Sequence, residues 1–256
     1  MQSGFFCLES RALFPENRSG QTAAVNRLFC FLLGIASVLP ASAAESTSKL
    51  STLIKETQKT RSDADTFVLA WWIPHQFWEE SFRNNPRMTD AQKQDFLKTL
   101  QDYTVMAVVD AKKGGLAIFS YVAAEEVLKT AKLTVSDGTT FSALSESDLA
   151  PGARNLFSMM KPIFANMMGQ FGQNTIFVVF PGKGSDGDKL IDPYKEGQLN
   201  FVENGHSFSW RLPLGSLLPD ETCPKCGEVL PGNYKFCPYD GTKLEPVAVP
   251  ASSPGS

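Results

Sequence analysis

The chain has 256 residues, of which 43% are hydrophobic and 20% charged, and its formal net charge at pH 7 is −3. This composition is typical of a globular protein and excludes a collagen-like fibre or a protein with several membrane spans. The slightly acidic balance also argues against a nucleic-acid-binding protein, because such proteins carry an excess of Lys and Arg to neutralise phosphates.

Residues 1–44 have the pattern of a secretory signal peptide. An uncharged apolar run at 28–39 follows a charged residue, a proline interrupts it, and small residues then supply an A-x-A cleavage pattern. The run is well short of the ~20 residues that cross a bilayer as a helix. We therefore predict cleavage near Ala43 or Ala44, a periplasmic or secreted location, and no integral membrane span in the mature chain.

The first part of the mature chain predicts helices around one buried strand. Residues 46–66 are mostly polar and predict a short amphipathic helix or a loose leader. The apolar run at 67–73 is rich in strand formers and predicts a buried strand, after which Pro74 can begin a helix. Thr89 is a good N-cap, and Gln92 three residues later completes the capping box of a further helix.

The middle of the chain predicts a hairpin followed by short elements. Residues 103–109 and 116–122 predict two strands, joined by residues 110–115 with turn chemistry. A short helix is expected at 123–129, and an alternating strand at 132–137.

The longest helical pattern covers residues 148–171, and it is followed by a strand at 174–180. The helix has one apolar face, which we expect to be buried, formed by Leu156, Met160, Ile163, Met167 and Phe171.

A second hairpin is predicted at 198–202 and 207–212, because Asn204-Gly205 between them is typical of a type I′ turn. Neighbouring strands thus pair as hairpins with helices between the groups. This order favours an α+β domain at residues 46–218, with a mixed or antiparallel sheet and flanking helices, over a doubly wound parallel sheet. Residues 246–256 are rich in Pro, Ser and Ala and predict a disordered tail.

A cysteine-rich module occupies residues 220–245. Two matching units stand in it, Cys-Pro-Lys-Cys-Gly from Cys223 and Cys-Pro-Tyr-Asp-Gly from Cys237. A Cys-x-x-Cys turn places two thiolates at one point, and the following glycine lets the chain turn back. The pattern resembles the zinc-ribbon family, whose knuckles read CPxCG…CPxCG, with Asp240 in place of the fourth cysteine. The resemblance implies a structural Cys₃Asp zinc site formed by Cys223, Cys226, Cys237 and Asp240.

Two alternatives to zinc stay open at this point. In an oxidising compartment Cys223 and Cys226 can form a disulfide, which leaves Cys237 without a partner. The module can also be a degenerate ribbon that holds no metal. In the family such ribbons dock to protein or nucleic acid, and the acidic balance of this chain favours protein.

A second group of candidate ligand-binding residues lies near the buried strand: Trp71, Trp72, His75, Trp78 and Glu79. His75 and Glu79 are four residues apart, as two side chains on one helix face would be. The tryptophans can serve as core residues or as an aromatic platform for a ligand. His75 and Glu79 could be two ligands of a metal site, but the sequence shows no evident third ligand to complete it.

Four methionines gather in the longest helix, at Met159, Met160, Met167 and Met168. Thioethers bind Cu(I), so soft-metal handling is one hypothesis, although filling of the core fits the helical spacing better.

The sequence therefore favours an exported, non-catalytic binding or interaction protein with a C-terminal module held together by a zinc ion. The partner of this protein is another protein or an unknown ligand. A periplasmic enzyme that uses the His75, Glu79 and tryptophan cluster, and copper handling by the methionines, are the alternatives.

Overall fold

The structure is a computed structural model that describes residues 41–83, 88–115 and 118–244, with side chains from residue 49 onward. These residues all belong to one of the two compact units of the chain, residues 39–256. The predicted disordered tail at 246–256 lies outside the described residues. So does the predicted signal peptide, except for its last four residues, which begin the first described helix.

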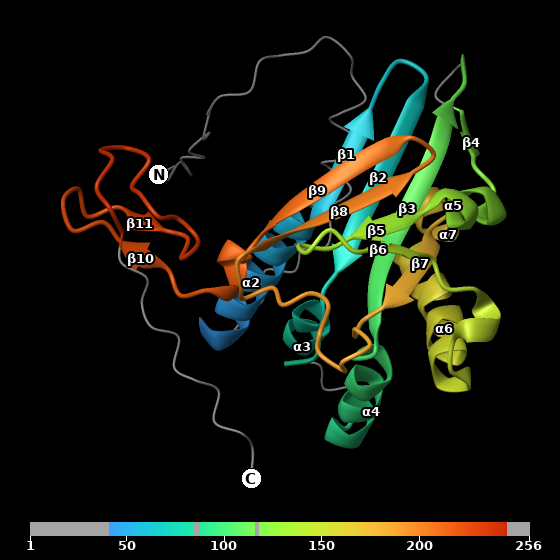
Figure 1. Ribbon diagram of the computed structural model, residues 1–256, viewed down its shortest axis with the longest axis horizontal. Helices are drawn as coiled ribbons and strands as arrows, with labels where there is room; N and C mark the ends of the chain where they lie inside the picture. The colour runs from blue at the N-terminus through green and yellow to red at the C-terminus, as the bar shows by residue number, and fades with distance from the viewer. Residues whose placement is uncertain (1–40, 84–87, 116–117, 245–256) are drawn as a thin grey trace, which may run out of the picture. The chain divides into compact units, whose positions relative to one another are not determined.

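The helices, shown in Figure 1, are α2 (Ala41–Thr57), α3 (His75–Arg83), α4 (Asp90–Leu100), α5 (Ala124–Thr130), α6 (Pro151–Met168) and α7 (Gln170–Gln173), with 3-10 turns η3 (Glu146–Asp148) and η4 (Gly215–Leu217). The first strands are β1 (Gln58–Ser62), β2 (Thr66–Ile73), β3 (Tyr103–Lys113), β4 (Phe119–Tyr121), β5 (Lys132–Thr134) and β6 (Thr140–Ser142). The later strands are β7 (Ile176–Pro181), β8 (Gly197–Glu203), β9 (His206–Leu212), β10 (Glu221–Thr222) and β11 (Val229–Leu230).

The protein is α+β with antiparallel sheets, as the sequence predicts. The larger sheet has the order β1-β2-β3-β4, with β7 also paired to β3. β3 pairs with β2 along one edge, while β7 and β4 share its other edge, β7 at 103–108 and β4 at 111–113. The smaller sheet has the order β6-β5-β8-β9, and every pairing in both sheets is antiparallel.

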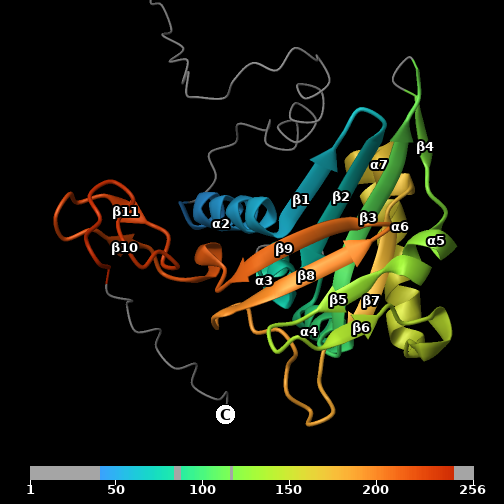
Figure 2. The ribbon, with the colours of Figure 1, turned by 45° about the horizontal axis from the view of Figure 1, so that its top comes forward.

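The larger sheet is covered on both faces. Figures 1 and 2 show β8 and β9 crossing one face, with α6 on the other. The rings of Phe180 in β7 and Phe201 in β8 lie 6.1 Å apart between the two sheets, and the rings of Phe164 in α6 and Phe177 in β7 lie 5.0 Å apart on the helical side. Two-sided burial explains why β2 and β3 are apolar runs with no polar alternation.

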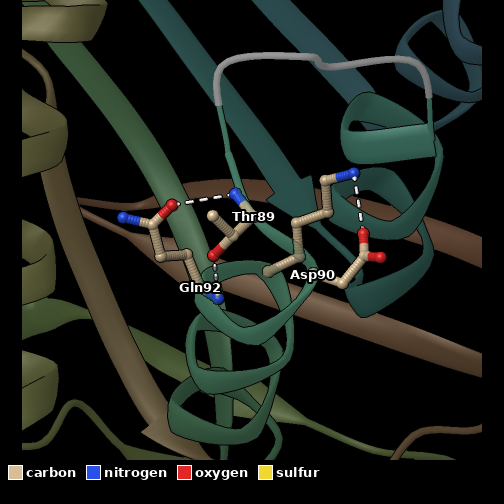
Figure 3. A network of polar contacts seen from close by, with 4 residues as sticks. Thr89, Asp90 and Gln92 are labelled. Carbon is tan, nitrogen blue, oxygen red and sulfur yellow. Dashed lines mark hydrogen bonds and ion pairs between the residues drawn. The ribbon is translucent and has the colours of Figure 1, made fainter.

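Several predicted elements are confirmed closely. The strand β2, the helix α5 and the hairpin β8–β9 lie where the patterns place them. Asn204 and Gly205 have φ values of 42° and 79°, the positive angles that a type I′ turn needs at both central residues. Figure 3 shows the capping box of α4, in which Gln92 N donates to Thr89 Oγ1 and Thr89 N donates to Gln92 Oε1.

Two predictions about helices need correction. Residues 58–62, within the segment predicted as a helix or loose leader, form strand β1, because β2 offers them an open edge for pairing. The expected apolar face of the long helix is also partly wrong, since Ile163 and Met167 are exposed. The face that packs on the sheet is rotated, and it holds Ala153, Leu156, Phe157, Met160 and Phe164.

In the described ranges, every helix is too short or too polar to cross a membrane.

The fully buried Thr57 links the two sheets. Its carbonyl oxygen accepts a hydrogen bond of 2.8 Å from Trp210 Nε1 in β9, and its Oγ1 accepts one of 3.2 Å from Trp71 Nε1 in β2. The same hydroxyl donates to Leu53 O at 2.8 Å. Both buried indole N–H groups therefore depend on one residue at the end of α2.

We expect Thr57→Val to destabilise the protein by about 1–3 kcal/mol, because it leaves Trp71 Nε1 buried without an acceptor while the side-chain shape is kept. Thr99→Val is the matched control, since Thr99 Oγ1 also donates to the carbonyl four residues before it but is exposed. Urea unfolding measures both variants. Equal losses of stability would contradict the role of the Trp71 bond.

Glu203 is a carboxyl group buried between the sheets. Its side chain has no exposed surface, and neither carboxylate oxygen has a hydrogen-bond partner among the described residues. Burial, with the nearby charges of Asp110 and Glu126, raises the pKa of Glu203 to about 8. Asp110 differs, because its Oδ2 accepts a hydrogen bond of 2.9 Å from Asn204 Nδ2.

This burial predicts a stability that falls as pH rises. The folded protein holds the Glu203 proton up to about pH 8, whereas the unfolded chain loses it near the ordinary pKa of 4.5. The free energy of unfolding therefore falls by on the order of a few kcal/mol as the pH rises between these two values. We expect Glu203→Gln to remove this slope and to be more stable than the natural chain at pH 8. Unfolding of both at several pH values, with Glu125→Gln on the exposed face of α5 as control, measures the effect. If the difference in unfolding free energy between Glu203→Gln and the natural chain is the same at pH 5 and pH 8, the raised pKa of Glu203 is contradicted.

Candidate metal centre

The cysteine-rich module consists of two knuckles with the same backbone pattern. In the first, Cys223 N donates to Glu228 O at 2.8 Å and Gly227 N donates to Cys223 O at 2.9 Å. In the second, Cys237 N donates to Thr242 O at 2.8 Å, and the N–H of the matching glycine donates to Cys237 O at 2.9 Å. The sequence repeat therefore has a structural counterpart in two equal turns.

Each turn needs a glycine at its end. Gly227 has a φ of 75° and Gly241 a φ of 72°, values in the left-handed region that side chains with a Cβ disfavour. Short pairings then bring the chain back: β10 pairs with β11 around the first knuckle, and Phe236 bridges Lys243 around the second.

The knuckles bring four potential ligands together. One ligand atom from each of the four predicted residues lies within 4.8 Å of all the others. Cys226 Sγ and Cys237 Sγ are 3.6 Å apart, and Cys223 Sγ lies 3.6 Å from Asp240 Oδ2. These residues are close enough to bind one metal ion.

The centre has a small apolar core of its own. The side chains of Cys223 and Cys237 are buried together with Leu230 and Leu244, while Cys226 is exposed. Thiolates that are partly shielded from water bind a cation more strongly than thiolates in open solvent, because the effective dielectric constant is lower.

Backbone hydrogen bonds lower the pKa of two of the four groups and so favour their charged forms. The backbone N–H of Thr242, which donates to Asp240 Oδ1 at 2.9 Å, holds the pKa of this carboxyl well below its usual range. The backbone N–H of Cys226 lowers the pKa of Cys223. The backbone N–H of Glu228 has the same effect on Cys226, but desolvation and the neighbouring ligands outweigh it and raise the Cys226 pKa to about 12. A bound cation must therefore displace a proton from Cys226.

All three cysteines of the module are free thiols in the structure. The Cys223–Cys226 disulfide, one of the alternatives to zinc, is not formed. The sulfur atoms of Cys226 and Cys237 are 3.6 Å apart, well beyond the bonded distance of about 2.05 Å.

The second group of predicted residues is divided between core and surface. Trp71 and Trp72 are buried in β2, where Trp71 packs edge-on against Phe77 with ring centroids 5.0 Å apart. Trp78 is half-buried and contacts Phe96 in α4, with ring centroids also 5.0 Å apart. Trp71 and Trp72 therefore act as core residues and do not open onto a cleft.

His75 and Glu79 do meet, on the half-exposed face of α3. His75 Nδ1 lies 3.2 Å from Glu79 Oε1, and His75 Nε2 lies 3.1 Å from Leu97 O. The contact with Glu79 raises the pKa of His75 and lowers that of Glu79. The His75–Glu79 contact lies within α3, and the contact of His75 with Leu97 O joins α3 to α4, so both imidazole nitrogens already have partners.

The four methionines do not converge on one point. Met160 is buried in the core and Met168 is half-buried, whereas Met159 and Met167 face solvent. The four are close along the chain, but adjacent residues on a helix point about 100° apart and therefore reach different surroundings.

No family model matches the sequence, and no curated protein or solved structure gives a significant match to the chain. The geometry of the knuckles is therefore the basis for any functional conclusion.

Proposed function

We propose that this chain is an exported, non-catalytic binding or interaction protein whose C-terminal module is a structural zinc ribbon. The observation that carries the proposal is the convergence of the four ligand atoms, within 4.8 Å of one another. The signal-peptide pattern of residues 1–44 supports export.

The spacing of the ligands fits a tetrahedral zinc ion. Sulfur atoms at 2.3 Å from a tetrahedral centre are separated by about 3.8 Å, and the Cys226 and Cys237 sulfurs are 3.6 Å apart. Asp240 Oδ1 is engaged by Thr242 N, which leaves Oδ2 to complete the set. Three thiolates and one carboxylate are ligands that zinc accepts, and they carry the same charge as four thiolates.

A structural role follows from the number of protein ligands. Zinc in catalytic sites keeps one position for water or substrate, whereas four protein ligands close the coordination sphere. The buried core of the module consists of only four residues, Cys223, Leu230, Cys237 and Leu244. Such a small core needs a metal or a disulfide to fold, so metal binding would supply the stability of the module.

The surface of the module supports a role in interaction. Four of its large apolar side chains are exposed: Val229, Tyr234, Phe236 and Tyr239. Aromatic side chains with a polar tip are enriched at protein–protein contacts, where they combine a large buried area with a hydrogen-bonding group. The partner that fits this surface is another protein.

The metal proposal predicts one zinc ion per chain, counted by native mass spectrometry of the full chain. Asp240→Ala should weaken zinc binding by at least roughly tenfold in a chelator competition, and Asp240→Cys should restore or strengthen it, because it completes four thiolates. Asp188→Ala, in an exposed loop, is the control that should change nothing. A full chain without zinc, or an Asp240→Ala variant that binds zinc as tightly as the natural chain, would disprove the site.

The interaction proposal is tested with a photo-reactive phenylalanine analogue at Tyr234. A matched position is Tyr194, which lies outside the module and has the same exposed fraction of 43%. We expect protein cross-links from position 234 in an extract of the source cells, lost when zinc is removed by a chelator. Equal cross-linking at both positions, or cross-linking that does not depend on zinc, would contradict docking through the module.

A further inference from the structure

Two sulfur atoms of the candidate metal centre lie in contact across the two knuckles. Cys226 Sγ in the first knuckle is 3.6 Å from Cys237 Sγ in the second, although the two residues are eleven positions apart in the sequence. Because a disulfide bond is about 2.05 Å long, these sulfur atoms have about 1.5 Å left to close. The fold therefore brings together a pair of thiols, one from each knuckle.

The third thiol of the module, Cys223, has different neighbours. Its sulfur accepts a hydrogen bond from the backbone N–H of Cys226 and lies 3.6 Å from Asp240 Oδ2. A carboxylate forms no disulfide, so a bond between Cys226 and Cys237 leaves Cys223 as a single thiol in the module. A centre with four cysteines would instead hold two such pairs.

The two thiols of the pair differ in their access to solvent. Cys226 is exposed, whereas Cys237 has only 2% of its surface exposed. Zinc holds its cysteine ligands as thiolates, which is the form that reacts with oxidants. A dissolved oxidant reacts first with an exposed thiolate, and a neighbouring thiol then resolves the product as a disulfide. The arrangement assigns the first role to Cys226 and the second to Cys237.

We propose that Cys226 and Cys237 are a redox-modification site at which hydrogen peroxide converts the zinc centre into a disulfide. The proposal rests on the zinc centre proposed above. The Cys226 thiolate attacks one peroxide oxygen, the O–O bond breaks, and a sulfenic acid forms as hydroxide leaves. The Cys237 thiolate then attacks this sulfur and displaces a second hydroxide. Two thiolates have lost two electrons, and the peroxide has become two water molecules with two protons from solvent.

The disulfide removes two of the four zinc ligands. Cys223 and Asp240 by themselves do not close a tetrahedral site, so the zinc ion leaves with its charge unchanged. The new covalent bond joins the same two knuckles that the metal joined, and it therefore still constrains the module. One peroxide molecule is consumed for each zinc ion released.

Peptide mapping after oxidation identifies the pair. The zinc-loaded full chain is treated with increasing amounts of hydrogen peroxide, and zinc release is measured with a chromogenic chelator. Remaining thiols are alkylated before digestion with trypsin and mass spectrometry. Lys225 and Lys235 separate the three cysteines of the module into three tryptic peptides, 212–225, 226–235 and 236–243. The mass of a linked pair of peptides therefore names the disulfide directly.

We expect one peroxide molecule to release one zinc ion and to link peptide 226–235 to peptide 236–243, while Cys223 stays open to alkylation. A phosphine reductant and added zinc should reverse the change, because both ligands return. Cys223→Ser should form the same linked pair, since it keeps both sulfur atoms of the site. Asp240→Cys should consume two peroxide molecules on complete oxidation and leave no thiol in the module, because the introduced thiol gives Cys223 a partner.

Three results would overturn the proposal while the zinc centre stands. These are zinc that stays bound in excess peroxide, a link between peptides 212–225 and 226–235, and overoxidation of Cys226 without any linked peptide. Failure of the zinc centre is a separate result, because it is seen before oxidation as a full chain without zinc. That result would also remove the release step, and the peptide map of the reduced chain would still show which two thiols join.

Discussion

The burial of β3 on both faces is the constraint on which the rest of the domain depends. This strand pairs with β2 on one edge and with β7 and β4 on the other, so its backbone groups are satisfied inside the sheet. Its side chains must then be covered by two different layers, β8 with its neighbours on one side and α6 on the other. Thr57 at the end of α2 accepts hydrogen bonds from Trp71 in β2 and Trp210 in β9, and so ties the two sheets to this helix.

The same packing explains why the carboxyl group of Glu203 is buried without a hydrogen-bond partner among the described residues. Glu203 follows the inward alternation of β8, in which Leu199 and Phe201 are also buried, and it therefore points between the sheets although it is a carboxyl group. The tight turn at Asn204 fixes this register, since a slip by one residue would turn every apolar side chain outward. A neutral, protonated Glu203 is how the fold accommodates that position near neutral pH.

The sequence predicted best where local chemistry decides the structure. The capping box at Thr89 and the turn at Asn204-Gly205 depend on residues a few positions apart, and both are confirmed. Strand β1 was missed because its polar residues become a strand only through pairing with β2. Ile163 was assigned to the wrong face, because apolar spacing shows that a helix has an apolar side but not which of two apolar sides meets the sheet.

The candidate site follows the same division. The sequence by itself determined the four residues of the candidate metal centre and the glycines after them, because two turns of five residues fix how thiol and carboxylate groups are spaced. Only the tertiary structure decided that the two turns face each other, with Cys226 beside Cys237 and Cys223 beside Asp240. It also decided that Trp71 and Trp72 are core residues and that Met159 is exposed while Met160 is not. Burial is a property of packed layers, and no spacing within one segment specifies which layer will cover it.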